Sequence, residues 1–161
     1  MKTSYLFPYR FKKISGIVFW TILIITIYGF LDYNAIIEND FFYFKVFAVA
    51  DTSFLTEKVI FGVTKNYILD EILFFLLIVS GLIYAFSKEK IEDEMVSKIR
   101  LESLVWATYF NYISILLCYM FLYGFAFLNV MMIALFSHLL FFIVRFRWMM
   151  YKQNKSLSYE E

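Results

Sequence analysis

The chain has 161 residues, of which 62% are hydrophobic and 23% aromatic, whereas soluble domains are only roughly 45 to 50% apolar. This composition excludes an ordinary soluble globule and predicts a membrane protein. The formal net charge of +1 excludes a global basic field for nucleic acid, and the single cysteine, Cys118, excludes an intramolecular disulfide and a cysteine-ligated zinc site.

The first predicted element is a membrane helix over residues 14–31, ISGIVFWTILIITIYGFL. Lys2, Arg10, Lys12 and Lys13 precede it without an acid, which is typical of a basic cytoplasmic flank. A cleaved signal peptide is the alternative, but its apolar core spans only ~7 to 15 residues and is followed closely by a small-residue site. We therefore expect a retained membrane helix.

Residues 32–66 are expected to form an outer loop on the non-cytoplasmic side. Its segment Phe41 to Ala50 is too short to span the bilayer, and its aromatic content predicts a place at the membrane interface. Because a loop of ~34 residues without internal structure is uncommon, we expect a short interfacial helix, capped by Thr52 or Ser53 and running to Gly62.

A second membrane helix is predicted over residues 67–87, with Asn66 as its N-cap. Asp70 and Glu71 fall in its first turns. In a structural interpretation they interact with the positive end of the helix near the outer headgroups. In a functional interpretation they bind cations or protons at the mouth of a pore.

The segment 88–103 is densely charged and runs without a helix breaker into the third predicted membrane helix, 104–123. We expect one long helix from Lys88 to Tyr123 whose cytoplasmic half is wet and carries Lys and Glu four residues apart. Apolar residues at a spacing of four form a candidate docking stripe on it: Ile91, Met95 and Ile99. This stripe is covered either by the chain's own termini or the lipid surface, or by a second copy or another protein.

The fourth predicted membrane helix covers residues 127–146 and follows a tight hairpin link. Arg145 and Arg147 mark its exit, and in the tail beyond them we expect Trp148 and Tyr151 at the membrane interface, then basic residues, then a polar end that frays. With four spans, all but three of the 15 Lys and Arg lie on the side that holds both termini and the 88–103 segment. The positive-inside rule therefore predicts an N-in, C-in topology with that side cytoplasmic.

Four polar residues are predicted at a common depth, one in each span: Thr21, Ser80, Asn111 and His138. At 1.5 Å per residue, each lies ~10 to 14 Å inside the cytoplasmic boundary. Asn111 and His138 are expected to hydrogen-bond across the last hairpin if both face inward. His138 has two further interpretations, a proton-relay or pH-sensing group and a metal or haem ligand, but neither a second histidine nor a Glu-x-x-His spacing accompanies it.

Templates of catalytic sites are missing from the sequence. There is no G-x-S-x-G, no Gly-rich phosphate loop and no H-E-x-x-H, and the predicted spans carry no deep carboxylate pair and no serine with a base. We therefore expect no enzymatic activity, no cofactor and no metal site.

The run SKEKIEDEMVSKIRLESLVWATYFNY, followed by YGFAFLNVMM and FFIVRF, resembles the second half of small uncharacterised four-helix integral membrane proteins of Bacteroidetes-type bacteria. The resemblance covers Ser87 to Arg147. It implies a bacterial inner membrane and transfers no functional residue to this chain.

These observations favour an all-α membrane protein with a single integral membrane domain over residues 1–161. We expect a non-enzymatic inner-membrane interaction or scaffold protein that docks partners through its cytoplasmic charged helix. Expected partners are the lipid bilayer and either a second copy in a homo-oligomer or a membrane or cytoplasmic protein, and no nucleic acid. The alternative is a small channel or transporter built by oligomerisation, with the polar layer lining the path and Asp70 and Glu71 at its mouth.

Overall fold

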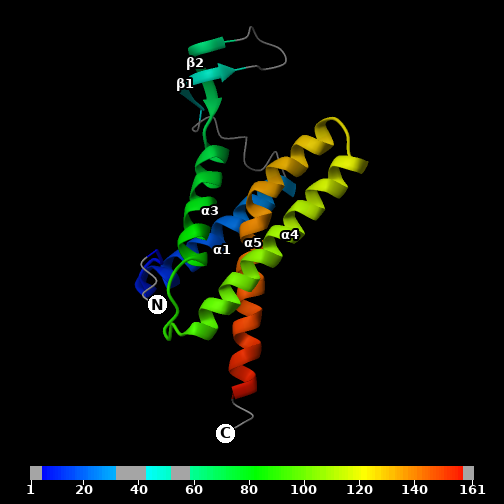
Figure 1. The fold of residues 1–161 in the computed structure, drawn as a ribbon. Helices are drawn as coiled ribbons and strands as arrows, with labels where there is room; N and C mark the ends of the chain where they lie inside the picture. Colours follow the sequence, from blue (N-terminus) through cyan, green and yellow to red (C-terminus); the bar gives the residue numbers. More distant parts are fainter. Residues whose placement is uncertain (1–4, 32–42, 52–58, 158–161) are drawn as a thin grey trace. The chain divides into compact units, whose positions relative to one another are not determined.

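The structure is a computed structural model and describes residues 5–31, 43–51 and 59–157. These residues form four helices, α1 (Tyr9–Leu31), α3 (Leu69–Ala85), α4 (Glu94–Phe121) and α5 (Phe125–Leu157), and two strands, β1 (Tyr43–Asp51) and β2 (Val59–Tyr67) (Figure 1). The chain divides into two compact units. Unit 1 comprises Met1–Phe19 with Ile78–Glu161, and unit 2 comprises Trp20–Leu77.

Three helices in the described part of the chain are long and apolar enough to cross a membrane: Tyr9–Gly29 in α1, Glu94–Phe121 in α4 and Ala126–Gln153 in α5. The shortest has 21 residues, which at 1.5 Å per residue extend over ~31 Å, about the thickness of the hydrocarbon core. In contrast, α3 has 17 residues and extends over only ~26 Å. The prediction of four helices is confirmed, and three of the four predicted spans have helices of sufficient length and apolar character to cross a membrane.

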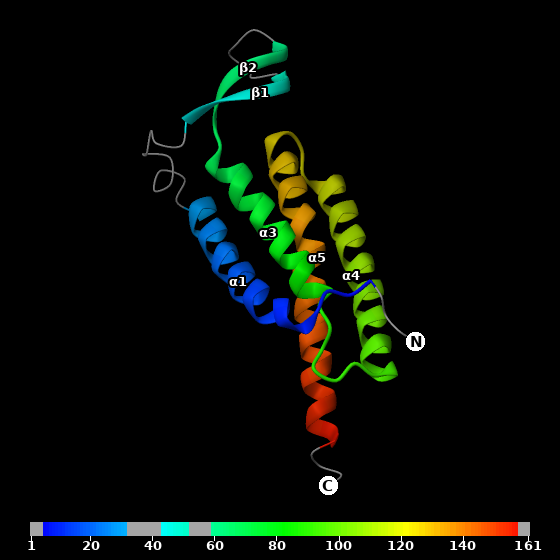
Figure 2. The ribbon, with the colours of Figure 1, turned by 90° about the vertical axis from the view of Figure 1, so that its left-hand side faces the viewer.

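In unit 1, α4 and α5 run side by side in opposite directions (Figure 1 and Figure 2). Their link contains Gly124, whose φ of 65° lies in the left-handed region that glycine adopts at little steric cost. The rings of Phe110 and Phe141 stack between the two helices with their centroids 4.3 Å apart. In addition, Ser137 Oγ donates a hydrogen bond of 2.7 Å to Asn111 Oδ1. The predicted tight hairpin between the last two helices is therefore present.

The core of unit 1 forms where the first turns of α1 and the last turns of α3 pack against α5. Phe19, Phe142 and Ile143 are fully buried there. Gly81 permits the close approach of α3, because a Cβ at this position would lie only 2.5 Å from Leu139 Cδ2 and 2.9 Å from Phe19 Cε2. A glycine at the contact therefore sets how closely α3 packs against α1 and α5.

The predicted continuous helix from Lys88 is wrong at its start. Residues 86–93 are not helical, and α4 begins at Glu94. Asp93 is its N-cap, and its carboxylate accepts a hydrogen bond of 2.8 Å from the backbone N–H of Val96. We expected Asp93 within a helix, but it caps the start of one instead. The short side chain of an aspartate accepts hydrogen bonds from nearby backbone N–H groups, and this favours the cap position over the helix interior.

The last helix is longer than predicted, since α5 continues from the expected exit at Arg147 to Leu157. The residues after Arg147 include Met, Lys and Gln, which are good helix formers, and they contain no glycine or proline. The tail beyond Arg147, of which we expected only the polar end to fray, is therefore helical as far as Leu157.

Unit 2 contains an antiparallel hairpin of β1 and β2, so residues 59–62, where we expected the end of a short helix, are strand instead, and the earlier residues of that predicted helix lie outside the described part of the chain. The register pairs Tyr43 with Tyr67 at one end and Asp51 with Val59 at the other. Both strands are rich in aromatic and β-branched residues, whose side chains favour extended backbone. Strand pairing therefore prevails over the helical pattern in this segment.

Asn66 is not the N-cap of the second span. It lies in β2, and α3 begins at Leu69. Its side-chain Nδ2 donates a hydrogen bond of 2.6 Å to Glu71 Oε1, so Asn66 contacts the first turn of α3 from outside the helix. Thr52 and Ser53, the predicted caps of the interfacial helix, lie outside the described residues.

Candidate functional site

The N-terminal segment of unit 1 is held against the link between α3 and α4. The backbone N–H of Phe7 donates to the carbonyl of Phe86 over 3.0 Å, and the N–H of Lys88 donates to the carbonyl of Phe7 over 2.9 Å. The side chain of Leu6 is buried at the same place. These contacts bring Leu6 and Phe7 beside residues 86–88.

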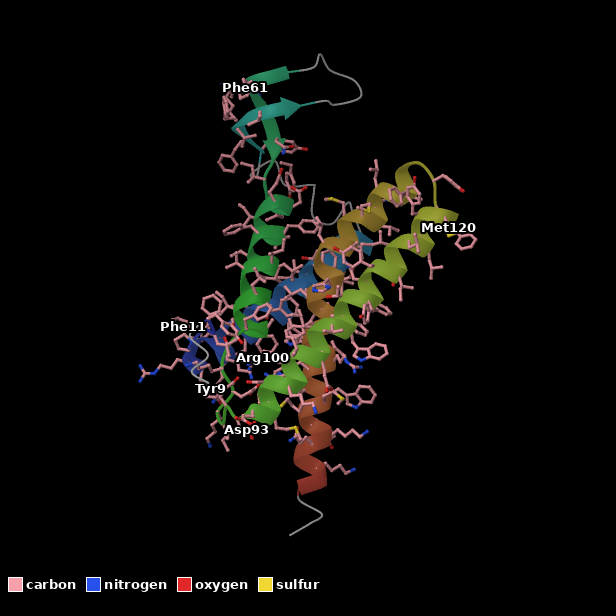
Figure 3. All side chains as sticks on the ribbon, in the orientation of Figure 1. Tyr9, Phe11, Phe61, Asp93, Arg100 and Met120 are labelled. Carbon is pink, nitrogen blue, oxygen red and sulfur yellow. The ribbon has the colours of Figure 1, made fainter. Side chains whose placement is uncertain are left out.

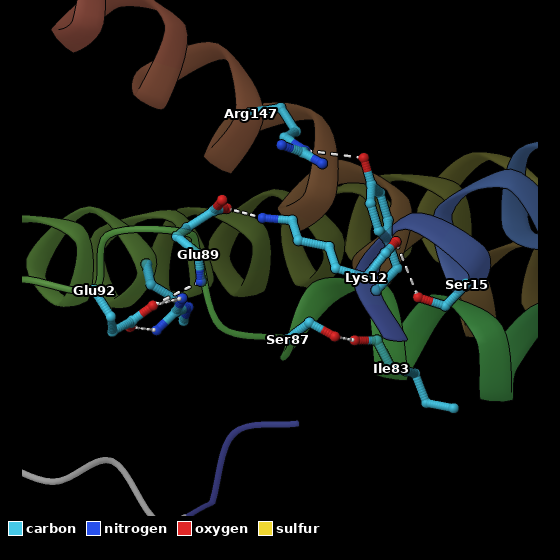
Figure 4. Close-up of polar contacts among 9 residues, drawn as sticks. Lys12, Ser15, Ile83, Ser87, Glu89, Glu92 and Arg147 are labelled. Atoms are coloured by element: carbon cyan, nitrogen blue, oxygen red, sulfur yellow. Dashed lines mark hydrogen bonds and ion pairs between the residues drawn. The ribbon is translucent and has the colours of Figure 1, made fainter. Parts of the chain in front are cut away.

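Four charged residues form two ion pairs at this end of unit 1, and we call them the boundary cluster: Lys12, Glu89, Glu92 and Arg100. Lys12 Nζ pairs with Glu89 Oε1. Arg100 donates from Nη1 to Glu92 Oε1 over 2.5 Å and from Nη2 to Glu92 Oε2 over 3.1 Å (Figure 4). Both acids lie in the 86–93 link, whereas Lys12 belongs to α1 and Arg100 to α4. The two pairs therefore fasten the link to both helices.

The carboxylate of Glu92 is held in its ionised form by its surroundings. Burial alone raises the pKa of a carboxyl group, but here hydrogen bonds from Arg100 and from the backbone N–H of Glu89, together with the charges of Arg100 and Lys12, outweigh burial. The pKa of Glu92 consequently lies below its ordinary value. A charged Glu92 is what a buried guanidinium requires as its partner.

Arginines near the boundary cluster stack on aromatic rings of neighbouring helices. The guanidinium carbon of Arg100 lies 5.3 Å from the ring centroid of Phe146, and that of Arg145 lies 4.9 Å from Trp106. A third pair joins α5 to α3: Arg147 stacks at 5.0 Å on Tyr84, and its Nε also donates to the Tyr84 hydroxyl over 2.9 Å. These contacts are of the cation–π type and tie the cationic ends of the helices together.

A groove of about 360 Å³ lies between the first turns of α4 and the last turns of α5, and we call it the stalk groove. Its residues are Met95, Lys98, Ile99, Glu102, Met149, Lys152 and Gln153. The methionines and the isoleucine supply an apolar surface, the two lysines place positive charge along it, and Glu102 adds one negative charge. This arrangement suits an amphipathic partner that carries both apolar and acidic side chains.

The predicted docking stripe is divided by the start of α4. Ile91 lies in the link and is 74% exposed, whereas Ile99 lies in α4 and is 6% exposed. Met95 is half exposed, and Met95 and Ile99 both line the stalk groove. The three residues therefore do not share one helix face, because the helix that would align them begins only after Ile91.

The predicted polar layer is brought together only in part. Asn111 is bonded to Ser137 rather than to His138, so the predicted bond between Asn111 and His138 is not formed. His138 follows Ser137 by one residue, which turns it ~100° around the helix axis. It is half-buried, and Ser80 is buried in α3. Thr21 belongs to unit 2, whereas the other three belong to unit 1.

The predicted outer acids, Asp70 and Glu71, lie in the first turn of α3 as expected. Both are exposed, and Glu71 accepts the hydrogen bond from Asn66. Within the described residues, no group of three or more His, Cys, Asp or Glu side chains is arranged to hold a metal ion.

Sequence reasoning missed the boundary cluster, although one signal for it was present. The buried face of α4 comprises Val96, Ile99, Arg100, Ser103 and Ala107. Arg100 stands on one helical face with the small residues Ser103 and Ala107, which permit close packing. An arginine in line with such residues indicates a buried guanidinium, and a buried guanidinium needs a carboxylate.

No protein-family model, no curated protein and no solved structure matches this chain significantly. The resemblance of Ser87 to Arg147 to membrane proteins of Bacteroidetes-type bacteria therefore stays a prediction.

Proposed function

We propose that this chain is a non-enzymatic membrane interaction protein that binds a protein partner through the stalk groove. The observation that carries the proposal is the groove itself, in which Met95 and Met149 lie beside Lys98 and Lys152 at the ends of two candidate membrane helices. Methionine side chains adapt to different apolar partners, and lysines select acidic ones. The partner that fits is an amphipathic helix with apolar residues on one face and carboxylates along its edges.

The proposal includes four membrane crossings with both termini in the cytoplasm of a bacterium. Two features support this orientation. The boundary cluster joins the start of α1, the link after α3 and the start of α4 in unit 1, and Arg147, ten residues before the end of α5, contacts Tyr84 of α3. Most of the Lys and Arg of the chain lie at this end, which the positive-inside rule assigns to the cytoplasm.

The proposed fourth crossing is α3. Its length of 17 residues falls short of the hydrocarbon thickness by ~4 Å, a mismatch that local thinning of the bilayer or flanking polar residues accommodate at modest cost. Large apolar side chains are exposed along it, including Ile72, Phe75 and Leu82. Such a surface suits lipid and not water.

Site-specific photo-cross-linking in cells tests the docking proposal. A photoreactive amino acid at Met149, inside the groove, should capture one discrete partner, and the same amino acid at Leu101, which is exposed on α4 outside the groove, should not. Reversing the charges with Lys98→Glu and Lys152→Glu should reduce the captured product at least tenfold. Equal capture at both positions, or capture that survives the charge reversal, would remove the groove as the docking site.

The variant Ile91→Ser separates the stalk groove from the stripe predicted from sequence. Ile91 lies outside the groove and is exposed, so its replacement should leave capture at position 149 unchanged. In contrast, Met95→Ser changes a groove residue of similar size and should weaken capture. If Ile91→Ser has the larger effect, the partner binds along the link and not in the groove.

The channel or transporter remains the alternative, although Asn111 of its proposed polar layer is engaged with Ser137. Ion flux through reconstituted liposomes tests it directly. Flux that is present in the wild type and lost in Asn111→Ala or His138→Ala, with folding intact, would displace the docking proposal.

A further inference from the structure

The hairpin of unit 2 carries a pair of lysines that face each other. The register places Lys45 directly opposite Lys65, between the pair Tyr43 with Tyr67 and the pair Phe47 with Val63. Because side chains alternate along a strand, all three pairs project from the same face of the hairpin. The rings of Tyr43 and Tyr67 lie 5.3 Å apart, which agrees with a shared face.

Beside the two lysines this face carries large apolar side chains that are exposed in the described part of the chain. The side chains of Phe47, Phe61 and Val63 are 66 to 69% exposed, and the rings of Phe47 and Phe61 lie 6.5 Å apart (Phe61 is labelled in Figure 3). Phe61 has a φ of 53°, an unfavourable value for a residue other than glycine. A hairpin of two strands is marginally stable in water at best, so contact of this face with an apolar surface would stabilise it.

The two lysines indicate that a surface in contact with this face carries negative charge. Like charges directly opposite each other destabilise a hairpin unless an anion lies between or above them. Both lysines are exposed, and within the described part of the chain neither forms an ion pair. Two ammonium groups beside exposed aromatic rings are the combination found at membrane interfaces, where the rings enter the acyl boundary and the lysines reach the phosphates.

Chain connectivity keeps this face near a bilayer surface if α3 lies in the membrane. Lys65 precedes Leu69, the first residue of α3, by four residues, so their Cα atoms are at most ~14 Å apart. The headgroup layer is ~5 to 8 Å thick on each side of the hydrocarbon core. A hairpin that lies along the surface therefore brings both lysines to the level of the phosphates.

We propose that the face of the β1–β2 hairpin with Lys45 and Lys65 binds the headgroups of anionic phospholipids. The inference goes beyond docking at the stalk groove and rests on the proposed insertion of α3 into the membrane. Anionic lipids are favoured over an acidic protein or a second copy because, with α3 in the membrane, the chain holds both lysines within reach of lipid phosphates. Any other partner has to displace these phosphates from the lysines. Each lysine contributes about fivefold to the preference for an anionic bilayer surface.

Fluorescence quenching in nanodiscs tests this binding. A fluorophore is attached to Phe47→Cys in a Cys118→Ser chain, and spin-labelled headgroups and aqueous iodide serve as the two quenchers. The matched control is Val46→Cys, the neighbouring residue on the opposite face. In discs with phosphatidylglycerol, lipid should quench position 47 more strongly than position 46. With Lys45→Gln and Lys65→Gln the ratio of lipid to iodide quenching should fall by about 30-fold, and with both lysines changed to Arg it should be retained.

Three results would overturn the inference. The first is iodide quenching of position 47 as strong as that of a free dye, and the second is protection of position 47 from both quenchers, which indicates a protein or a second copy on this face. The third is an unchanged ratio of lipid to iodide quenching after loss of both lysines. A separate fluorophore at Leu76→Cys in α3, with a quencher in the acyl chains, tests the insertion of α3. Without quenching there, the proposed fourth crossing fails by itself. Quenching at position 76 together with iodide access at position 47 refutes only the hairpin proposal.

Discussion

Replacing Glu92 by Gln should destabilise unit 1 by leaving a guanidinium without its carboxylate. The side chain of Arg100 is 7% exposed and that of Glu92 is 16% exposed, so neither gains much water when the pair is broken. Removing one partner of a buried ion pair costs about 3 to 5 kcal/mol. The stacking of Arg100 on Phe146 survives and stabilises the cation in part. We therefore expect the lower end of this range, about 3 kcal/mol, which is on the order of 100-fold in the unfolding equilibrium.

Unfolding by sodium dodecyl sulfate in mixed micelles, followed by far-ultraviolet circular dichroism, measures this free energy. The control is Glu102→Gln, which removes an exposed carboxylate from the same helix and should change the free energy of unfolding by no more than ~0.5 kcal/mol. A double-mutant cycle with Arg100→Met isolates the pair: the double variant should be less destabilised than the sum of the single variants, because no unpaired charge remains. Additive effects, or a Glu92→Gln variant as stable as the wild type, would refute the reasoning.

The same pair predicts a dependence of stability on pH. The pKa of Glu92 is lower in the folded than in the unfolded chain. Its stabilising effect is therefore fully present above the unfolded pKa of ~4.3 and is lost as the pH falls through the folded value. The difference in stability between wild type and Glu92→Gln should accordingly shrink below about pH 4. A difference that stays constant down to pH 3 would show that the charge of Glu92 is not responsible.

The remaining predictions concern single contacts. Asp93→Ala removes the N-cap of α4 and should lower stability by about 0.5 to 2 kcal/mol, with faster amide hydrogen exchange at Val96; unchanged exchange would argue against the cap. Gly81→Ala places a Cβ against Leu139 and should cost about 1 to 3 kcal/mol in the same detergent titration, and a neutral effect would show that this contact relaxes freely. Asn111→Ala removes the hydrogen bond to α5 and should cost only ~0.6 kcal/mol and at most ~2; a larger loss would mean that Asn111 does more than bridge two helices.

The helices of this protein are predictable to different degrees. The spans in α1, α4 and α5 follow from runs of apolar residues, because the transfer of a side chain into lipid depends mainly on that side chain and its near neighbours in the chain. In contrast, α4 begins where it does because Asp93 caps it and Glu92 pairs with Arg100. The local sequence pattern was equally compatible with a helix that begins at Lys88. The length of α5 beyond Arg147 was missed because arginines after an apolar run mark where a span leaves the membrane and not where its helix ends.

The candidate sites show the same division. Met95 and Ile99 were found from their spacing, but the groove they line needs Met149 from a helix some 50 residues later, which no local pattern connects to them. The boundary cluster was missed because Glu92 and Arg100 stand eight residues apart, which is not a helical pair spacing.

The sequence by itself determined where three helices long and apolar enough to cross a membrane lie and how the charges divide along the chain. Hydrophobic transfer is additive along a local stretch, so no partner has to be known. Only the tertiary structure decided that the acids of the 86–93 link turn toward Lys12 and Arg100, and that residues 43–51 pair with 59–67 as strands. Ion pairs and strand pairs depend on groups that are distant in sequence, and their strength is set by burial that exists only once the chain has folded.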